Sequence, residues 1–339
     1  MNQRRTKTIP KALKIAGFAL LVVVCITIIY TMFEFGIADR MNYVVNSDQK
    51  TCTVTGAKNP RTLVLHIPEE IDGYTVTAID HKAFSGYQMR IVKIPQTITK
   101  IGESAFYECK NLLWVNGIQK CSDLLEIGKF VFANCKSLLS LKLPESVEII
   151  NECAFTNCVM LNDVSIPSTV TTIGFSAFAT CTRFKQIYIP ASVNDIGERA
   201  FVGCFFLKDI SVDESNPRWS SLDGVLYNKD MTVLYLYPGG KYSKSYAIPD
   251  GVITIAEYSF AYNLDLEVLN IPNSVINIGD HVFADVKSQK SPLDTINYNG
   301  TIEMWNSIQK SPDWDSDSPN FTIYCTDGQI SKDGTVTYN

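Results

Sequence analysis

The sequence predicts a repeat solenoid, a fold in which short parallel strands of successive coils stack side by side. Three observations predict it. A phenylalanine recurs at nearly constant spacing, with steps of 22, 26, 23, 23, 23, 59 and 23 residues. A proline after a short apolar run follows the same period, and isoleucines form columns in the same register. A fixed period of this length is typical of solenoids. The phenylalanines are Phe84, Phe106, Phe132, Phe155, Phe178, Phe201, Phe260 and Phe283.

The stretch "SIPSTVTTIGFSAFATC", residues 165–181, contains most of one repeat. The apolar run before Pro167 predicts a short strand, because proline lacks the N–H group that would extend the ladder. Ile173 and Gly174 predict an inward-facing return segment and a bend. Phe178 is expected to fill the inside of the coil from a short helical turn. One repeat cannot bury its own apolar face, so the core should be a row of like residues from stacked coils.

The pattern L-x-x-I-x-I-P-x-x-V-x-x-I-G-x-x-A-F-x-x-C resembles the BspA-type (treponemal-type) leucine-rich repeat over residues 76–300. The resemblance implies an α/β solenoid whose short parallel strands line the concave face. The chain departs from the general leucine-rich motif, which has Asn or Cys at its ninth position. Here that position holds a hydroxyl, which is expected to bond backbone groups. The residues are Thr97, Ser146, Thr169, Ser192, Ser215 and Ser274.

The N-terminus predicts a transmembrane helix that precedes the solenoid. Residues 1–14 carry five basic and no acidic side chains, and 15–36 begin with a 19-residue run free of charge. Such a run is about long enough to cross a bilayer, and its basic flank should stay in the cytoplasm. A cleaved signal peptide, with a small-x-small site at 36–38, is the alternative. We expect a single-pass membrane protein with extracellular repeats, or a secreted one if the segment is cleaved.

The ends of the array and one irregular unit are expected to differ from the repeats. Residues 37–75 predict a β cap with a hairpin, because an uncapped solenoid would leave its first core layer wet. The 59-residue step contains a 36-residue unit, in which 213–247 predict a hairpin-like insert. Residues 301–339 predict a C-terminal cap or tail that begins with a closing helix.

Five of the ten cysteines lie three residues after the repeated phenylalanine. In parallel coils they should form a row of buried thiols that pack as small apolar groups. Such a row does not converge on a metal as zinc ligands must. Three scattered histidines do not change this conclusion, so we expect no metal and no cofactor. The cysteines are Cys109, Cys135, Cys158, Cys181 and Cys204.

Nothing in the sequence indicates catalysis or nucleic-acid binding. The motifs of serine hydrolases, zinc proteases, P-loops and dinucleotide sites are absent, so we predict no enzyme and no catalytic residue. The net charge is −5, and the N-terminal tail alone contributes +5. The remainder of the chain is therefore acidic, whereas nucleic-acid binding depends on basic side chains at phosphates.

Two groups of side chains are candidates for binding an extracellular protein or glycan. One is the outward row of the short strands, which combines polar groups with two aromatic anchors: Lys93, Trp114, Asn116, Lys142, Gln186 and Tyr188. The other is the aromatic hairpin of the irregular unit: Trp219, Tyr227, Tyr235 and Tyr237. Aromatic residues are enriched at binding surfaces, but they also favour strands, so packing is the alternative for both groups.

Two functions are consistent with these observations. Relatives of the BspA type are surface antigens linked to adhesion, and the resemblance implies an exported, membrane-anchored binding or adhesion scaffold. The alternative is an envelope structural protein with no dedicated ligand.

Overall fold

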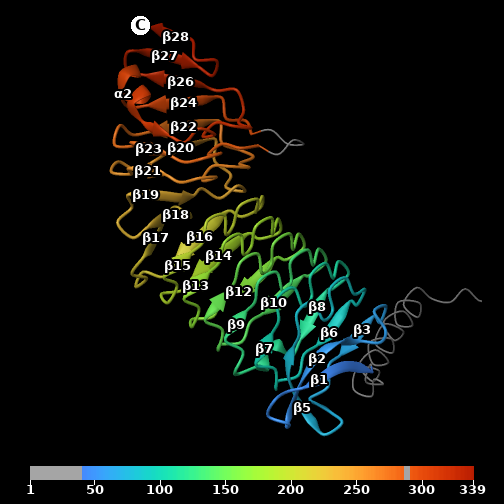
Figure 1. The fold of residues 1–339 in the computed structure, drawn as a ribbon. Coiled ribbons are helices and arrows are strands. Elements are labelled where there is room, and N and C mark those ends of the chain that lie inside the picture. Colours follow the sequence, from blue (N-terminus) through green and yellow to red (C-terminus); the bar gives the residue numbers. More distant parts are fainter. Residues whose placement is uncertain (1–39, 286–290) are drawn as a thin grey trace, which may run out of the picture.

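The computed structural model describes residues 40–285 and 291–339, which form an elongated stack of coils (Figure 1). The predicted tail at 1–14, the whole predicted membrane segment at 15–36 and the start of the cap at 37–39 lie outside this part. Among the described residues, no helix is both long and apolar enough to cross a bilayer.

Each coil except the one that contains β26 contributes one strand to each of two parallel ladders. The first ladder contains β3 (Val64–His66), β6 (Ile91–Lys93), β8 (Trp114–Asn116), β10 (Ser140–Lys142), β12 (Asp163–Ser165), β14 (Gln186–Ile189), β16 (Asp209–Val212), β20 (Ser245–Ala247), β22 (Val268–Ile271), β24 (Thr295–Tyr298) and β26 (Thr322–Cys325). The second contains β5 (Tyr74–Ile79), β7 (Lys100–Ile101), β9 (Glu126–Ile127), β11 (Ile149–Ile150), β13 (Thr172–Ile173), β15 (Asp195–Ile196), β19 (Val233–Leu236), β21 (Thr254–Ile255), β23 (Asn277–Ile278) and β25 (Gln309–Lys310).

The core lies between the two ladders. The central residues of successive first-ladder strands, such as Val92 and Leu141, point inward and are buried. The second ladder pairs like residues directly, as Ile150 with Ile173. The repeated phenylalanines form a stacked column between the ladders, and the ring centres of Phe155 and Phe178 lie 5.2 Å apart at an interplanar angle of 4°. The expectation of a row of like residues is confirmed.

The segment that carries the phenylalanine is a series of β-turns, so the expected short helical turn is wrong. In one coil, Ser176 and Thr180 have positive φ angles of 51° and 58°. The Phe178 N–H donates to the Ala200 carbonyl of the next coil at 2.8 Å. Backbone groups that bond along the solenoid axis cannot also close helical bonds within their own coil.

The expected ladder of hydroxyls is present at five of its six positions. Thr169 Oγ1 donates to the Val147 carbonyl of the preceding coil at 2.7 Å. Ser215 is the exception, because its hydroxyl donates to Asp213 within its own loop. The adjacent Asn216 amide replaces it and donates to two carbonyls of the preceding coil at 2.8 and 3.0 Å. The other four hydroxyls that bond the preceding coil belong to Thr97, Ser146, Ser192 and Ser274.

The N-terminal hairpin predicted from the sequence is present. β1 (Met41–Val45) pairs antiparallel with β2 (Thr51–Ala57), and β2 pairs parallel with β5. A short strand, β4 (Glu70–Ile71), pairs antiparallel with β5. This sheet covers the first core layer, where Cys52 and Val54 of β2 are fully buried.

The 36-residue unit is a three-stranded antiparallel meander rather than a projecting hairpin. β17 (Trp219–Leu222), which the sequence did not predict, pairs with β18 (Val225–Asn228), and β18 pairs with β19. β19 then joins β21 in the second ladder. Tyr237 takes the position of the repeated phenylalanine, because its ring stacks 5.2 Å from that of Phe260.

The meander divides the core into two clusters, one on either side of β18. The stack changes direction in this region, between β16 and β19 (Figure 1). The aromatic column is interrupted here, since no described ring contact joins Phe201 to Tyr237.

The ladders continue into the region expected to be a C-terminal cap. The helix α2 (Ile302–Ser307) does not close the array but lies between β24 and β25 within a coil. Thr301 caps it by accepting from the Met304 N–H, and Ile302 and Trp305 are buried, so the helix serves as one corner of that coil. The sheet ends with β27 (Gly328–Ser331), which pairs antiparallel with β26, and β28 (Val336–Tyr338), which pairs antiparallel with β27.

Candidate functional site

The outward residues of the first ladder lie in two parallel rows, which we call the strand face. β6 and β8 place Ile91 opposite Trp114 and Lys93 opposite Asn116. β14 and β16 continue the rows further along the stack, where Tyr188 is opposite Ser211. The structure therefore brings the residues of the first candidate group onto one surface. All are exposed except the half-buried Lys93.

The two aromatic anchors of the strand face are accessible. The side chain of Trp114 is 43% exposed and that of Tyr188 is 51% exposed. The Tyr188 hydroxyl donates to the carboxylate of Asp213 in the following coil. Hydrogen bonds from Ser215 and Tyr188 hold the pKa of Asp213 at about 2. The Tyr188 hydroxyl is thus held by a carboxylate that is ionised at neutral pH, while its ring stays at the surface.

The aromatic hairpin is not a surface patch, because the structure buries three of its four side chains. Trp219 is only 6% exposed, and Tyr227 and Tyr237 are fully buried. Only Tyr235 reaches the surface, with its ring edge-on to Trp219 at 4.7 Å. These residues join two core clusters, and the packing alternative holds for the three buried ones.

The cysteine row consists of free, buried thiols, as predicted. Each thiol donates to the carbonyl of a phenylalanine in the preceding coil, as Cys158 does to Phe132 at 3.1 Å. Burial raises the pKa of the Cys204 thiol to about 12. The row does not form a metal site, and no cluster of three or more potential metal ligands exists elsewhere in the described residues.

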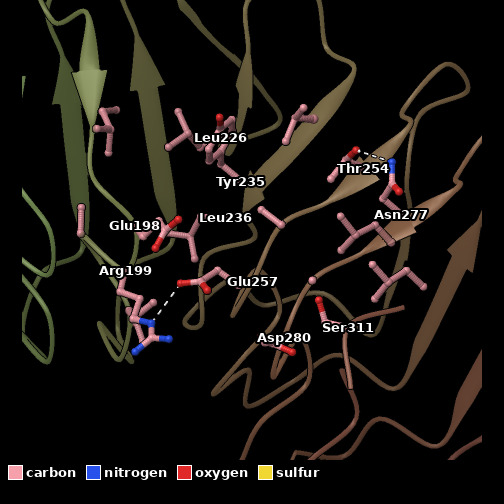
Figure 2. A pocket seen from close by; sticks show the side chains of 18 of the residues that line it. Glu198, Arg199, Leu226, Tyr235, Leu236, Thr254, Glu257, Asn277, Asp280 and Ser311 are labelled. Atoms are coloured by element: carbon pink, nitrogen blue, oxygen red, sulfur yellow. Dashed lines mark hydrogen bonds and ion pairs between the residues drawn. The ribbon is translucent and has the colours of Figure 1, made fainter. Parts of the chain in front are cut away.

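A cleft with a volume of about 760 Å³ lies beside β15, where the meander enters the solenoid (Figure 2). One wall is β15 and the turn that follows it, from Ile196 to Val202. The other wall is formed by β19, β21, β23 and β25. The cleft exists because β17 and β18 lie against β16 of the first ladder, which leaves β15 without a second neighbour. Its volume is in the range typical of ligand pockets.

Arg199 bridges the two walls at one end of the cleft (Figure 2). Its Nε donates to Glu257 Oε1 at 3.0 Å. Its guanidinium also lies 4.4 Å from the ring centre of Tyr258, and that ring stacks on His281. The charges of Arg199 and Glu257 therefore neutralise each other within the cleft.

The second cation of the cleft, Lys310, is also already hydrogen-bonded. Its ammonium donates to the carbonyls of Trp305 and Ile308 and lies 4.8 Å from the Trp305 ring centre. Burial lowers the pKa of Lys310 to about 8. Two carboxylates of the lining, Glu198 and Asp280, have no cation in ion-pair contact within the described residues.

Reasoning from the sequence missed this cleft. The signal for it was the 59-residue step, since a unit of different length cannot supply every hydrogen bond that a regular coil supplies. The residues concerned are far apart in the sequence and carry no motif, so the spacing alone could not show which coil edge stays open.

Comparisons with known proteins agree with this architecture. The family model "BspA type Leucine rich repeat region" matches in six copies, over residues 70–122, 115–221 and 237–306. The unmatched interval between the last two ranges contains β18 and β19 of the meander. A search of curated proteins finds no match.

Solved structures of bacterial repeat proteins are similar. A leucine rich cell surface protein of Faecalibacterium prausnitzii A2-165 aligns with a TM-score of 0.60 and 25% identity, covering 79% of this chain and 95% of that one. The pneumococcal vaccine antigen PcpA aligns with a TM-score of 0.63 and 25% identity, covering 76% and 73%. A leucine-rich repeat protein from Bacteroides ovatus ATCC 8483, at 0.53 and 23% over 77% and 70%, shares the fold.

The six matched copies cover well over half of the chain, and they coincide with coils whose two ladders, phenylalanine column and thiol row repeat in register. The chain belongs to the BspA-type leucine-rich repeat family.

Proposed function

We propose that this protein is an exported, membrane-anchored surface protein whose extracellular repeats bind a protein or glycan through the strand face. Family membership supports the surface location, because a similar solved protein is described as a cell surface protein and another as a vaccine antigen. The charge-free run at 15–33 and its basic flank support the anchor. We propose no catalytic role, since leucine-rich solenoids typically serve as scaffolds.

The observation that carries the binding role is the exposure of Trp114 and Tyr188 on the strand face. Aromatic side chains dominate the energetics of binding surfaces. Around them lie amides, hydroxyls and charges of both signs rather than a deep pocket. A long and shallow surface of this kind suits a macromolecule better than a small molecule.

Protease treatment of intact cells tests the location. The repeats should be degraded on intact cells, and the N-terminal tail at 1–14 should stay protected until the membrane is broken. A mass measurement of the mature protein distinguishes an anchored chain from one cleaved near 36–38. Protection of the repeats on intact cells would contradict an extracellular location.

A binding screen tests the function. The purified full-length protein is applied to immobilised matrix proteins, plasma proteins and cell-wall glycans. For any ligand found, we expect Trp114→Ala and Tyr188→Ala each to weaken binding about tenfold or more, the range of an interface anchor. Leu125→Ala is the matched control, because Leu125 is 54% exposed next to the second ladder, away from the strand face.

The screen has two contrary outcomes. If both aromatic variants bind as well as the wild type, the strand face is not the site. If no ligand is found in the whole screen, the alternative of an envelope structural protein is favoured.

A further inference from the structure

Among the described residues, backbone pairing in the second ladder is interrupted between β7 and β9 and between β15 and β19. β7 and β9 remain neighbours, whereas the cleft separates β15 from β19. In the regular coils, the backbone carbonyl of the second-ladder isoleucine accepts a hydrogen bond from the glycine N–H of the next coil. The Gly174 N–H donates to the Ile150 carbonyl, and the Gly197 N–H donates to the Ile173 carbonyl, both at 2.7 Å. β15 ends its sheet and pairs only with β13. Across residues 40–285 and 291–339, no donor reaches the carbonyl of Ile196. That carbonyl is an acceptor at an open edge.

The break continues through the turn after β15. One coil earlier, the Ser176 N–H donates to the backbone carbonyl of Glu198 at 3.0 Å. The Phe178 N–H donates to the backbone carbonyl of Ala200 at 2.8 Å. The equivalent donors of the next coil are the N–H groups of Arg199 and Phe201, and no acceptor within the described part of the chain bonds them. The edge therefore offers an acceptor followed by two donors, and residues 196–202 line the cleft.

An edge of this kind is a template for another strand. Unpaired backbone groups that are shielded from water cost free energy, and pairing with an extended segment satisfies them. Strand addition to an open edge is a known mode of peptide recognition. A glycan has no regular series of donors and acceptors at the spacing of a peptide backbone, so the edge favours a peptide.

The charges of the cleft indicate the composition of that peptide. Arg199 is bonded to Glu257, and Lys310 is bonded to backbone carbonyls. Glu198 is exposed beside the open edge, and Asp280 is half-buried on the other wall. Figure 2 shows both at the cleft. Two carboxylates without a cation in contact favour lysine or arginine in the bound segment.

We propose that the cleft beside β15 binds an extended basic peptide segment of a partner protein, which adds one strand to the open edge of β15. The backbone of the peptide donates to the Ile196 carbonyl and accepts from the N–H groups of Arg199 and Phe201. Its basic side chains lie near Glu198 and Asp280. This site is separate from the strand face, so it would remain if the strand face proved to bind nothing.

A synthetic library of short blocked peptides tests the proposal. Lysine or arginine alternates in them with β-branched residues, and each is titrated into the purified full-length protein by calorimetry. We expect binding by members of the library, and loss of about tenfold or more when alternate backbone amides of the peptide are N-methylated, because each lost hydrogen bond weakens binding. Amide hydrogen exchange at Arg199 and Phe201 should slow on binding.

Charge variants distinguish this site from general attraction. Glu198→Gln and Asp280→Asn should each weaken binding about two- to fivefold, as expected for a partly exposed charge pair. Glu103→Gln is the matched control, because Glu103 is exposed at the equivalent turn position of a distant coil. Thermal unfolding of each variant confirms that it is folded.

Several results would overturn the proposal. Equal binding of the N-methylated peptides would mean that the backbone is not recognised. Failure of the whole library to bind, or displacement of a bound peptide by cell-wall oligosaccharides, would exclude a peptide as the natural occupant. Dimerisation of the free protein with protection of the same amides would assign the cleft to a second copy of the chain.

Discussion

The guanidinium of Arg199 lies 4.4 Å from the ring centre of Tyr258, and its Nε lies 3.0 Å from Glu257 Oε1, 58 residues further along the chain. This contact joins the last regular coil before the meander to the first regular coil after it. It spans the place where the backbone ladder is broken, so side chains replace hydrogen bonds that the backbone makes elsewhere.

Removal of the Arg199 side chain should therefore destabilise the contact between the coils on either side of the meander. We expect Arg199→Met to lower the free energy of unfolding by about 1 kcal/mol, from a partly exposed ion pair and a cation–π contact. Arg199→Lys keeps the positive charge and should therefore lose less free energy of unfolding than Arg199→Met. Lys129→Met removes an ion pair of the same 3.0 Å length at a more exposed site and should cost measurably less than Arg199→Met. Urea unfolding measures all three, and equal losses for Arg199→Met and Lys129→Met would show that the contact has no special role.

Two glycines with the same backbone angle should respond differently to alanine. Gly117 and Gly251 both have a φ of +92°, but a Cβ at Gly117 would lie 2.1 Å from the Ile94 carbonyl oxygen, whereas nothing lies within 4 Å at Gly251. Gly251→Ala should cost about 1–2 kcal/mol from backbone strain alone. Gly117→Ala should cost about 3–5 kcal/mol, because overpacking adds to the strain. Thermal unfolding compares them, and similar losses would contradict the close approach of the two coils.

The phenylalanine column should respond according to burial. Phe178 is fully buried between Phe155 and Phe201, whereas Phe175 is 39% exposed three residues earlier. We expect Phe178→Ala to lower the free energy of unfolding by about 3–5 kcal/mol, because it leaves a cavity in the column. Phe175→Ala should cost less than about 1 kcal/mol. An unchanged denaturant midpoint for Phe178→Ala would remove Phe178 from the core.

The thiol row should make the protein less stable at alkaline pH. The pKa of Cys204 is raised from 9.0 to about 12 by burial, so its contribution is complete below pH 9 and is lost as the pH rises toward 12. The unfolded thiol ionises in this window while the folded one stays protonated. We expect stability to fall progressively as the pH rises from about 9 toward 12.

The variant Cys204→Ala isolates that contribution. Its stability should fall less steeply, by up to about 1.4 kcal/mol per pH unit, than that of the wild type. Lys310, whose lowered pKa acts in the opposite direction, is common to both proteins and cancels in the comparison. Equal slopes would mean that the Cys204 thiol ionises in the folded state.

Much of the fold was predictable from spacing alone. The period of 23 residues placed Phe155, Phe178 and Phe201 in one column, and the thiol row and most of the hydroxyl ladder followed from the same register. The turn geometry was not predictable in this way. The N–H groups of Ser176 and Phe178 bond the next coil, and only the three-dimensional stack supplies those partners.

Of the two candidate binding surfaces, one could be predicted from the sequence and the other could not. The strand face could be predicted, because side chains alternate along a strand and Trp114 and Tyr188 occupy outward positions. For the aromatic hairpin the sequence left packing and binding both open, since strand propensity does not distinguish a surface ring from a core ring. Tyr237 resembles a surface aromatic in sequence, yet it fills the position of the repeated phenylalanine.

By itself, the sequence determined the register of the repeats, the identity of the core columns and the family, because a periodic pattern states which residues must be equivalent. Only the tertiary structure decided where that equivalence stops. The meander packs against β16 rather than β15, and this choice depends on contacts between residues far apart in the chain. It leaves the edge of β15 open and forms the cleft that Arg199 bridges.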